Sequence, residues 1–189
     1  MSTLRIKVIV GSTRANRFSE KPAQWIYTEA QKRADLDVEL LDLRDYPLPL
    51  FEEPMPPGMA KDNYTNPVVV KWRDKIREGD GFIICTPEYN HGYPAVLKNA
   101  LDYTYFSWAR KAVAFVAWGG TGGVRSVEQL RLVAIELDMA PTRWAVHIPN
   151  PWFIQDASGV ATDQNNQAAK ALLDHLTWWA GALKAARGK

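Results

Sequence analysis

Residues 5–19 read RIKVIVGSTRANRFS, and this stretch decides how the rest of the chain is interpreted. Residues 5–10 form an almost continuous apolar run, which is followed by Gly11, by hydroxyl and basic side chains, and by helical spacing from Ser19 onward. A continuous apolar run is typical of a strand covered on both faces, as in the centre of a parallel sheet. The stretch therefore predicts a strand, a polar loop and a helix, the opening of a βαβ unit.

Four further strand-like runs alternate with helical patterns. They occupy residues 37–43 (DVELLDL), 81–86 (GFIICT), 112–118 (AVAFVAW) and 143–148 (RWAVHI). The runs at 81–86 and 112–118 are nearly all apolar and are expected in the centre of the sheet, whereas the other two alternate and are expected at its edges. No linker divides the chain, so with right-handed crossovers we expect one α/β domain over residues 1–189 with a doubly wound parallel sheet.

Apolar residues at helical spacing fill two of the connections between these runs and the segment after the last run. Helices are expected from Ser19, from Pro94 and from about Asn166. Their inward-facing stripes are predicted to be Ala23, Ile26, Tyr27, Ala30 and Ala34; Leu97, Ala100 and Leu101; and Leu172, Leu173, Leu176 and Leu183. Residues 46–67 are rich in proline, and the sequence leaves open whether they form a lid beside a ligand or a surface loop.

The helix expected after Gly123 carries two apolar stripes. One stripe is Val127, Leu130, Ala134 and Leu137, and the other is Leu132, Ile135 and Met139. A helix with two apolar stripes can pack against two partners, so the second stripe favours a subunit interface. A slightly apolar surface helix is the alternative.

The composition is that of an ordinary globular chain, with 189 residues, 47% hydrophobic and 23% charged. The 23 basic and 21 acidic residues nearly balance, and without a long basic run they disfavour a nucleic-acid partner. No apolar stretch reaches the roughly 20 residues that span a bilayer, so no membrane partner is expected. A single cysteine excludes an intrachain disulfide, and no signal-peptide pattern precedes the first run, so we expect a cytoplasmic protein.

The loop at residues 11–19 has the chemistry of a phosphate site. It leads into a helix N-terminus, where free backbone amides and the helix dipole favour an anion. Hydroxyl groups and two guanidinium groups add further donors. The glycine motifs of nucleoside triphosphate and dinucleotide sites are absent. The alternative is that Ser12 and Thr13 only form a turn and Ser19 only caps the helix.

Two more loops are expected to meet the first, because ligands of doubly wound sheets bind at the carboxyl ends of the strands. TPEYNHGYP at residues 86–94 is stiffened by proline and suits the edge of a planar heterocycle. GGTGG at residues 119–123 either lets the backbone approach a ligand closely or forms a flexible turn. His91 is expected to be a surface side chain rather than an acid–base catalyst, and Cys85 a packing residue rather than a nucleophile.

The motifs GSTRANRFS, PEYNHGYPAVLKNALDY and GGTGGVRS resemble, in this order, those of the NADPH-dependent FMN reductase family. The resemblance covers nearly the whole chain. It implies a flavodoxin-like fold with five strands in the order 2-1-3-4-5 and helices on both faces, a bound FMN, and a homodimer or homotetramer. It also implies a reductase that uses NADPH or NADH to pass hydride through N5 of FMN to a flavin, quinone or similar small acceptor, without a catalytic side chain or a metal.

The resemblance further implies which residues bind FMN. The helix that carries Lys98, Asn99, Leu101 and Asp102 would face a partner subunit, as would the helix with two stripes; the alternative is that Lys98 and Asp102 form an ordinary surface ion pair. For the FMN phosphate the residues are Ser12, Thr13, Arg14 and Ser19, with Arg17 or Phe18 nearby; for the isoalloxazine ring they are Pro87, Glu88, Tyr89 and Asn90 on one side and Gly119, Gly120, Thr121 and Gly122 on the other.

Two other functions remain open at this point. A flavodoxin-type electron carrier would bind FMN but react poorly with nicotinamides, and a flavin-binding interaction module would bind it without turnover. Electron carriers of that type are typically acidic, whereas this chain has a formal net charge of +2, which disfavours the first alternative. The physiological acceptor and the choice between NADPH and NADH are not indicated by any residue.

Overall fold

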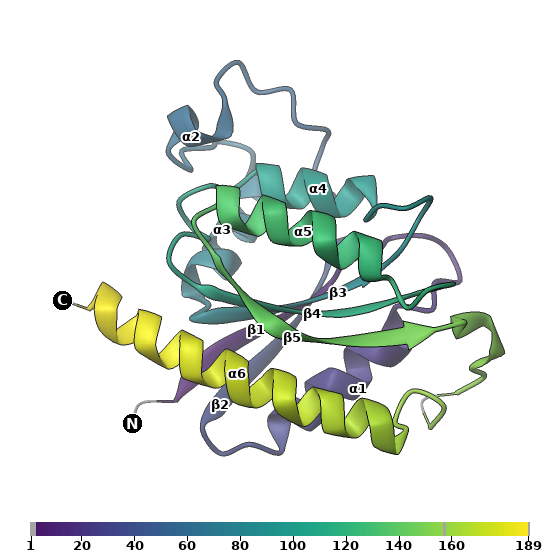
Figure 1. The fold of residues 1–189 in the computed structure, drawn as a ribbon. Helices are drawn as coiled ribbons and strands as arrows, with labels where there is room; N and C mark the ends of the chain where they lie inside the picture. Colours follow the sequence, from purple (N-terminus) through teal and green to yellow (C-terminus); the bar gives the residue numbers. More distant parts are fainter. Residues whose placement is uncertain (1–2, 157, 189) are drawn as a thin grey trace.

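Five parallel strands form one sheet in the order β2-β1-β3-β4-β5 (Figure 1). The structure, a computed structural model, describes residues 3–156 and 158–188. The strands are β1 (Leu4–Val10), β2 (Leu36–Asp42), β3 (Gly81–Pro87), β4 (Ala112–Gly119) and β5 (Ala140–Pro149). The predicted doubly wound, flavodoxin-like order is confirmed, with β1, β3 and β4 in the centre and β2 and β5 at the edges.

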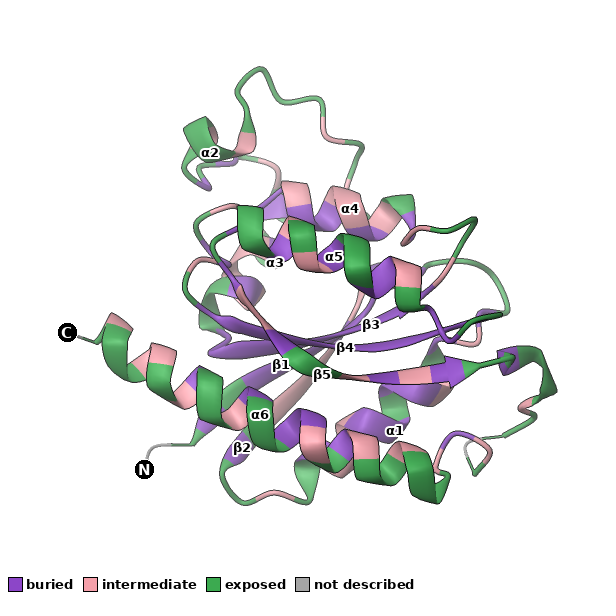
Figure 2. Ribbon diagram, viewed as in Figure 1, coloured by how far each residue is buried: buried purple, intermediate pink, exposed green. Residues whose placement is uncertain are grey.

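Helices cover both faces of the sheet, as predicted (Figure 1). One face packs against α1 (Glu20–Gln31) and α6 (Asp163–Arg187). The opposite face packs against α3 (Pro67–Glu78), α4 (Ala95–Asp102) and α5 (Val124–Glu136). The short elements are η1 (Leu43–Asp45), α2 (Pro57–Ala60) and η2 (Pro151–Phe153). Every residue of β3 and β4 is buried between the two helical layers, which explains why their sequences do not alternate (Figure 2).

Several details differ from the sequence predictions. Helix α1 ends at Gln31, so Ala34 lies beyond it and is exposed. The last helix begins at Asp163 rather than near Asn166, because the Thr162 side chain accepts a hydrogen bond from the amide of Asn165 and caps it. Helix α3 was not predicted as a separate element, although proline in its first turn and Asn66 as its N-cap are ordinary start signals.

The second stripe of α5 is smaller than predicted. Leu132 and Ile135 are exposed, but Met139 is buried in the core. The helix ends at Glu136, and the chain then turns at Asp138, whose φ is 55°. Met139 therefore leaves the helix surface and enters the core just before β5, which helical spacing does not reveal.

The proline-rich segment extends beyond α4, on the side of the sheet that carries α5 (Figure 1). Asn99 holds it at two points: its side-chain oxygen accepts from the amide of Phe51 at 2.9 Å and its nitrogen donates to the carbonyl of Pro49 at 2.7 Å. The buried carboxylate of Asp62 accepts from the amides of Tyr105 and Ser107, both at 2.7 Å. The segment is thus tied to the region around α4 by specific polar contacts.

Candidate flavin site

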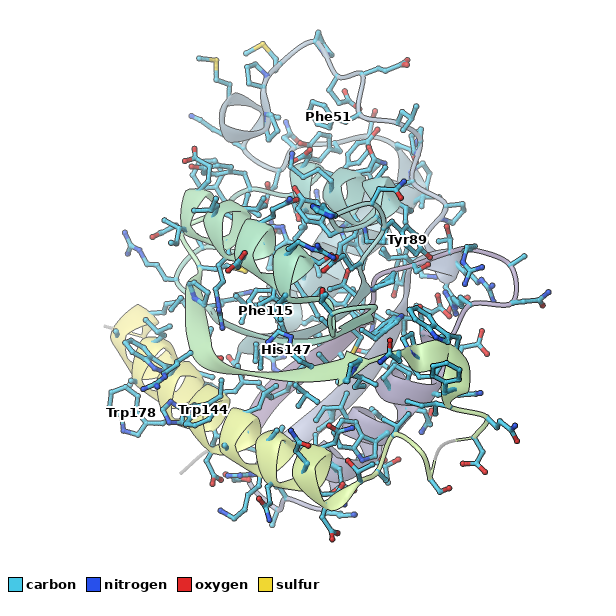
Figure 3. The ribbon with its side chains drawn as sticks, turned by 45° about the vertical axis from the view of Figure 1, so that its right-hand side comes forward. Phe51, Tyr89, Phe115, Trp144, His147 and Trp178 are labelled. Carbon is cyan, nitrogen blue, oxygen red and sulfur yellow. The ribbon has the colours of Figure 1, made fainter. Side chains whose placement is uncertain are left out.

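Three loops meet at the carboxyl ends of β1, β3 and β4, because these strands are parallel neighbours. The amide of Gly11 donates to the carbonyl of Cys85 at 2.8 Å, which joins the first loop to β3. The amide of Glu88 donates to the carbonyl of Trp118 at 2.8 Å, which joins the second loop to β4. Figure 3 shows Tyr89 at this end of the molecule and Trp178 at the opposite end.

Loop one (residues 11–19) presents hydrogen-bond donors to solvent. Within the described part of the chain, the amides of Thr13, Ala15 and Asn16 have no protein acceptor. The hydroxyl of Ser19, the residue that precedes α1, likewise makes no hydrogen bond to the described residues. Free amides and a hydroxyl at a helix N-terminus are the groups that bind a phosphate.

The two arginines of loop one have different surroundings. Arg17 is buried and pairs through both terminal nitrogens with the carboxylate of Asp42 at the end of β2, and it also donates to the carbonyl of Ser12. Its donors are therefore used to fasten loop one to the sheet. Arg14 is exposed and remains available to a ligand. Sequence reasoning missed Arg44, which donates to the carbonyl of Arg14 at 2.7 Å and adds a positive charge behind the loop.

Tyr89 connects loop one with loop two (residues 86–94). Its hydroxyl lies 2.8 Å from the hydroxyl oxygen of Ser12 and accepts a hydrogen bond from Nε of Arg14 at 3.3 Å. Tyr89 and Arg14 are both exposed. The proposed phosphate loop and the proposed ring loop therefore share one hydrogen-bonded group, a contact across 75 residues that no local pattern could indicate.

Loop two contains a tight two-residue turn. Tyr89 and Gly92 exchange backbone hydrogen bonds of 2.8 and 3.0 Å, and between them Asn90 and His91 have φ values of 50° and 72°. Positive φ at both central residues is the mark of a type I′ turn. Among the described residues, the amides of Asn90 and His91 have no acceptor, so they are free for the edge of a ligand.

Loop three (residues 119–123) is a close turn between β4 and α5. The amide of Gly122 donates to the carbonyl of Gly119 at 3.0 Å, and Gly122 and Gly123 have φ values of 75° and 73°. A Cβ on Gly123 would lie 2.7 Å from both Cβ of Ala117 and the amide nitrogen of Trp118. Glycine is therefore required at position 123 for the helix to start so close to its strand.

Glu88 and Arg125 join loops two and three. The buried carboxylate of Glu88 accepts from Nε of Arg125 at 2.6 Å and from the amide of Arg125, in the first turn of α5, at 3.2 Å. Arg125 also reaches Nε2 of His91 at 2.9 Å and the hydroxyl of Thr121 at 3.2 Å. Because a guanidinium only donates, Nε2 of His91 is the acceptor. We call this group the Arg125 clamp, and sequence reasoning missed it.

The predicted site residues all lie in these loops but differ in exposure. Whether each touches a cofactor stays a prediction. The exposed ones are Thr13, Arg14, Tyr89, Asn90, Gly120 and Thr121; the buried ones are Ser12, Arg17, Ser19, Pro87, Gly119 and Gly122; Phe18 and Glu88 are partly buried.

Neither a reactive cysteine nor a metal-binding cluster lies at this edge of the described structure. Burial raises the pKa of the Cys85 thiol, so it is not available as a thiolate nucleophile. Among residues 3–156 and 158–188, no group of three His, Cys, Asp or Glu side chains could hold a metal ion. None of the described helices has the length and hydropathy needed to cross a membrane.

These loops fit FMN in particular. The free amides, the hydroxyl of Ser19 and the guanidinium of Arg14 match a phosphate monoester, and the outward-facing amides of loop two match the polar edge of a flavin ring. A Cβ added to Gly120 would meet only Trp152, at 3.5 Å, so the backbone is open to a ligand there. Fold and site together define a flavodoxin-like flavin-binding protein.

The chain belongs to the NADPH-dependent FMN reductase family, whose model matches residues 4–152. It is 40% identical over 155 residues to an NAD(P)H-dependent FMN reductase of Schizosaccharomyces pombe, covering 81% of this chain and 78% of the relative. It is 36% identical to an NAD(P)H:quinone oxidoreductase of Solanum tuberosum, covering 73% of this chain and 72% of that one.

The fold also matches solved flavoenzyme structures. The NAD(P)H:(acceptor) oxidoreductase of Paracoccus denitrificans superposes with a TM-score of 0.76 at 21% identity, covering 95% of this chain and 98% of that one. At this identity the likeness establishes the fold.

Proposed function

We propose that this protein is an FMN-containing oxidoreductase that uses NADPH or NADH to reduce a flavin, a quinone or a similar small acceptor. The observation that carries the proposal is the meeting of three loops whose free amides, with Arg14, suit FMN. Membership of the FMN reductase family supports it. The cytoplasmic location expected from the single cysteine is part of the same proposal.

Bound FMN would supply hydride uptake from the nicotinamide and electron transfer to the acceptor, so no side chain has to act as a nucleophile. The residues of the chain bind and orient. Arg14 and the amides of loop one would hold the phosphate, while the amides of Asn90 and His91 would donate to the pyrimidine edge of the ring. The Arg125 clamp would keep loops two and three at a constant separation.

Absorbance spectroscopy of the purified protein tests the proposal. A spectrum is recorded after FMN is added and again after NADPH is added under anaerobic conditions. We expect a bound flavin whose absorbance in the oxidised state is lost when NADPH is added, followed by turnover when a quinone is supplied. Bound flavin that stays oxidised, or is reduced without turnover, would favour the electron carrier or the interaction module. Failure to bind FMN would contradict the assignment of the three loops.

We further propose that the exposed stripe of α5 forms the interface of a homodimer. Leu132 and Ile135 are 71% and 62% exposed, which is unusual for two neighbouring large aliphatic side chains. Leu132 borders a groove that also contains the Lys98–Asp102 ion pair of α4, at 2.7 Å. An apolar stripe flanked by a polar rim is the usual composition of a subunit interface.

Changing both Leu132 and Ile135 to glutamate is expected to convert the dimer to a monomer, because it would place like charges in an apolar contact. The mass is measured by light scattering after size exclusion. The matched control is Trp178→Glu on α6, which is 66% exposed on the opposite face of the sheet. A smaller particle for the control but not for the α5 variant would contradict this interface.

A further inference from the structure

Besides Tyr89 and Phe106, the described part of the chain exposes two groups of aromatic side chains. Trp144, Trp178 and Trp179 lie at one end, on β5 and α6, and Figure 3 shows Trp144 and Trp178 together there, away from Tyr89. Trp152 and Phe153 lie at the other end, in η2, and are 64% and 78% exposed. Only the second group adjoins the candidate flavin site.

The turn that carries Trp152 and Phe153 is fastened to loop three and to α1. The amide of Asn150, whose φ is 49°, donates to the carbonyl of Gly119 in loop three at 3.0 Å. Lys21 on α1 donates to the carbonyl of Gln155 at 2.6 Å. Hydrogen bonds within the turn, from Phe153 to Asn150 and from Ile154 to Pro151, both 3.1 Å, hold its shape.

Trp152 adjoins the open backbone of loop three. Its indole ring lies 3.5 Å from the position that a Cβ of Gly120 would occupy. Phe153 stands beside it at 6.2 Å between ring centroids, in an edge-to-face arrangement. Nearby, Phe18 and Trp118 pack edge to face at 5.9 Å, and Trp118 is buried. Trp152 and Phe153 are thus a pair of exposed rings, of which Trp152 adjoins loop three.

We propose that Trp152 and Phe153 form an aromatic platform for the planar ring of the electron acceptor, such as a quinone. The inference rests on the proposed function. Water-exposed aromatic side chains on a braced turn gain little from folding, but they stack favourably on a planar ligand. The place of Trp152 beside Gly120 puts that ligand next to the backbone that would border the flavin ring.

The position of the turn also favours an acceptor over a macromolecular partner. Trp152 lies at the carboxyl edge of the sheet, next to Gly120 of loop three, whereas the apolar stripe proposed as a subunit interface lies on the outer face of α5. Two side chains offer the area of one small ring system rather than of a protein interface, which needs about 800 Å² on each partner. The platform is therefore a specificity site for a small planar acceptor.

The test compares Trp152→Ala with Trp178→Ala, whose side chain is equally exposed (66%) but distant from the site. For the holoenzyme, we expect Trp152→Ala to raise the KM for 2-methyl-1,4-naphthoquinone about tenfold. The affinity for 2-naphthol, a planar ring that the enzyme does not reduce, should fall by a similar factor in equilibrium titrations. Trp152→Phe should restore most of the wild-type KM and most of the affinity for 2-naphthol. Trp178→Ala should change neither the KM nor this affinity.

Each other outcome overturns the inference. An unchanged KM and an unchanged 2-naphthol affinity in Trp152→Ala would show that no acceptor stacks there. Loss of FMN from that variant would assign Trp152 to the cofactor, and a change in particle mass would assign it to a protein interface. Because the wild-type protein is first shown to be reduced by NADPH, these results are distinguishable from a failure of the proposed function.

Discussion

Replacing Gly123 by alanine is expected to lower the free energy of unfolding by about 2–5 kcal/mol. A left-handed backbone conformation costs an ordinary residue about 1–2 kcal/mol, and overpacking adds about 1–3 kcal/mol. The overlap is with rigid groups, because the added Cβ would lie 2.7 Å from Cβ of Ala117 and from the backbone nitrogen of Trp118. Helix α5 would have to move away from β4, which would also misplace loop three and weaken FMN binding.

Urea unfolding of the apoprotein measures the first effect, and FMN titration measures the second. Gly181→Ala is the matched control, since a Cβ there meets nothing within 4 Å and the residue lies inside α6. Alanine at that position should stabilise the protein by up to about 1 kcal/mol, the difference in helix propensity. Equal stability of Gly123→Ala and the wild type would show that the turn has room for a side chain.

Replacing Arg17 by alanine is expected to lower the free energy of unfolding by about 3 kcal/mol. Removing one partner of a buried ion pair costs about 3–5 kcal/mol because the remaining charge is unpaired. Since the Asp42 side chain is 24% exposed and partly hydrated, the lower end of this range applies. The carbonyl of Ser12 also loses its donor, so loop one should loosen.

The effect should depend on pH. Burial raises the pKa of Asp42, but the hydrogen bonds and charge of Arg17 outweigh it, so the net shift is below the ordinary value of 3.8. A carboxyl with a lowered folded-state pKa stabilises the protein fully above its unfolded-state pKa, and this stabilisation is lost as the pH falls through the folded-state pKa. The difference in the free energy of unfolding between Arg17→Ala and the wild type should therefore be smaller at pH 3 than at pH 7.

Arg14→Ala is the comparison variant for Arg17→Ala. The Arg14 side chain is exposed and its hydrogen bond is to the hydroxyl of Tyr89, so stability should change by less than about 0.5 kcal/mol. FMN affinity should instead fall roughly 10- to 100-fold, since a charge-assisted contact contributes about 1.5–3 kcal/mol. Unchanged FMN affinity in Arg14→Ala would mean that the phosphate binds elsewhere.

The layered fold was accessible to sequence reasoning because it depends on local patterns. The unbroken apolar runs of β3 and β4 required cover on both faces, and the helices between the strands required parallel pairing. The same patterns placed all three loops at one edge of the sheet, since parallel strands end together. The detailed motifs of those loops carried the family resemblance.

The pairing of side chains was not accessible in this way. Arg17 and Arg14 are three positions apart in one polar loop, yet only Arg17 meets Asp42, because β2 lies beside β1. Met139 has the spacing of an outer stripe, but the turn at Asp138 carries it into the core.

By itself, the sequence determined the order of the strands and of most helices, the edge at which we place the ligand and the residue types available there, because apolar periodicity and turn chemistry act over a few neighbouring residues. Only the tertiary structure decided which charged side chains pair with other residues of the protein and which remain available to a ligand. The Glu88–Arg125 contact spans 37 residues, and Trp152 meets Gly120 only because β4 and β5 are adjacent. Such contacts depend on how the elements pack. The free energy of that packing arises from segments that are far apart in the chain, so no single segment reveals it.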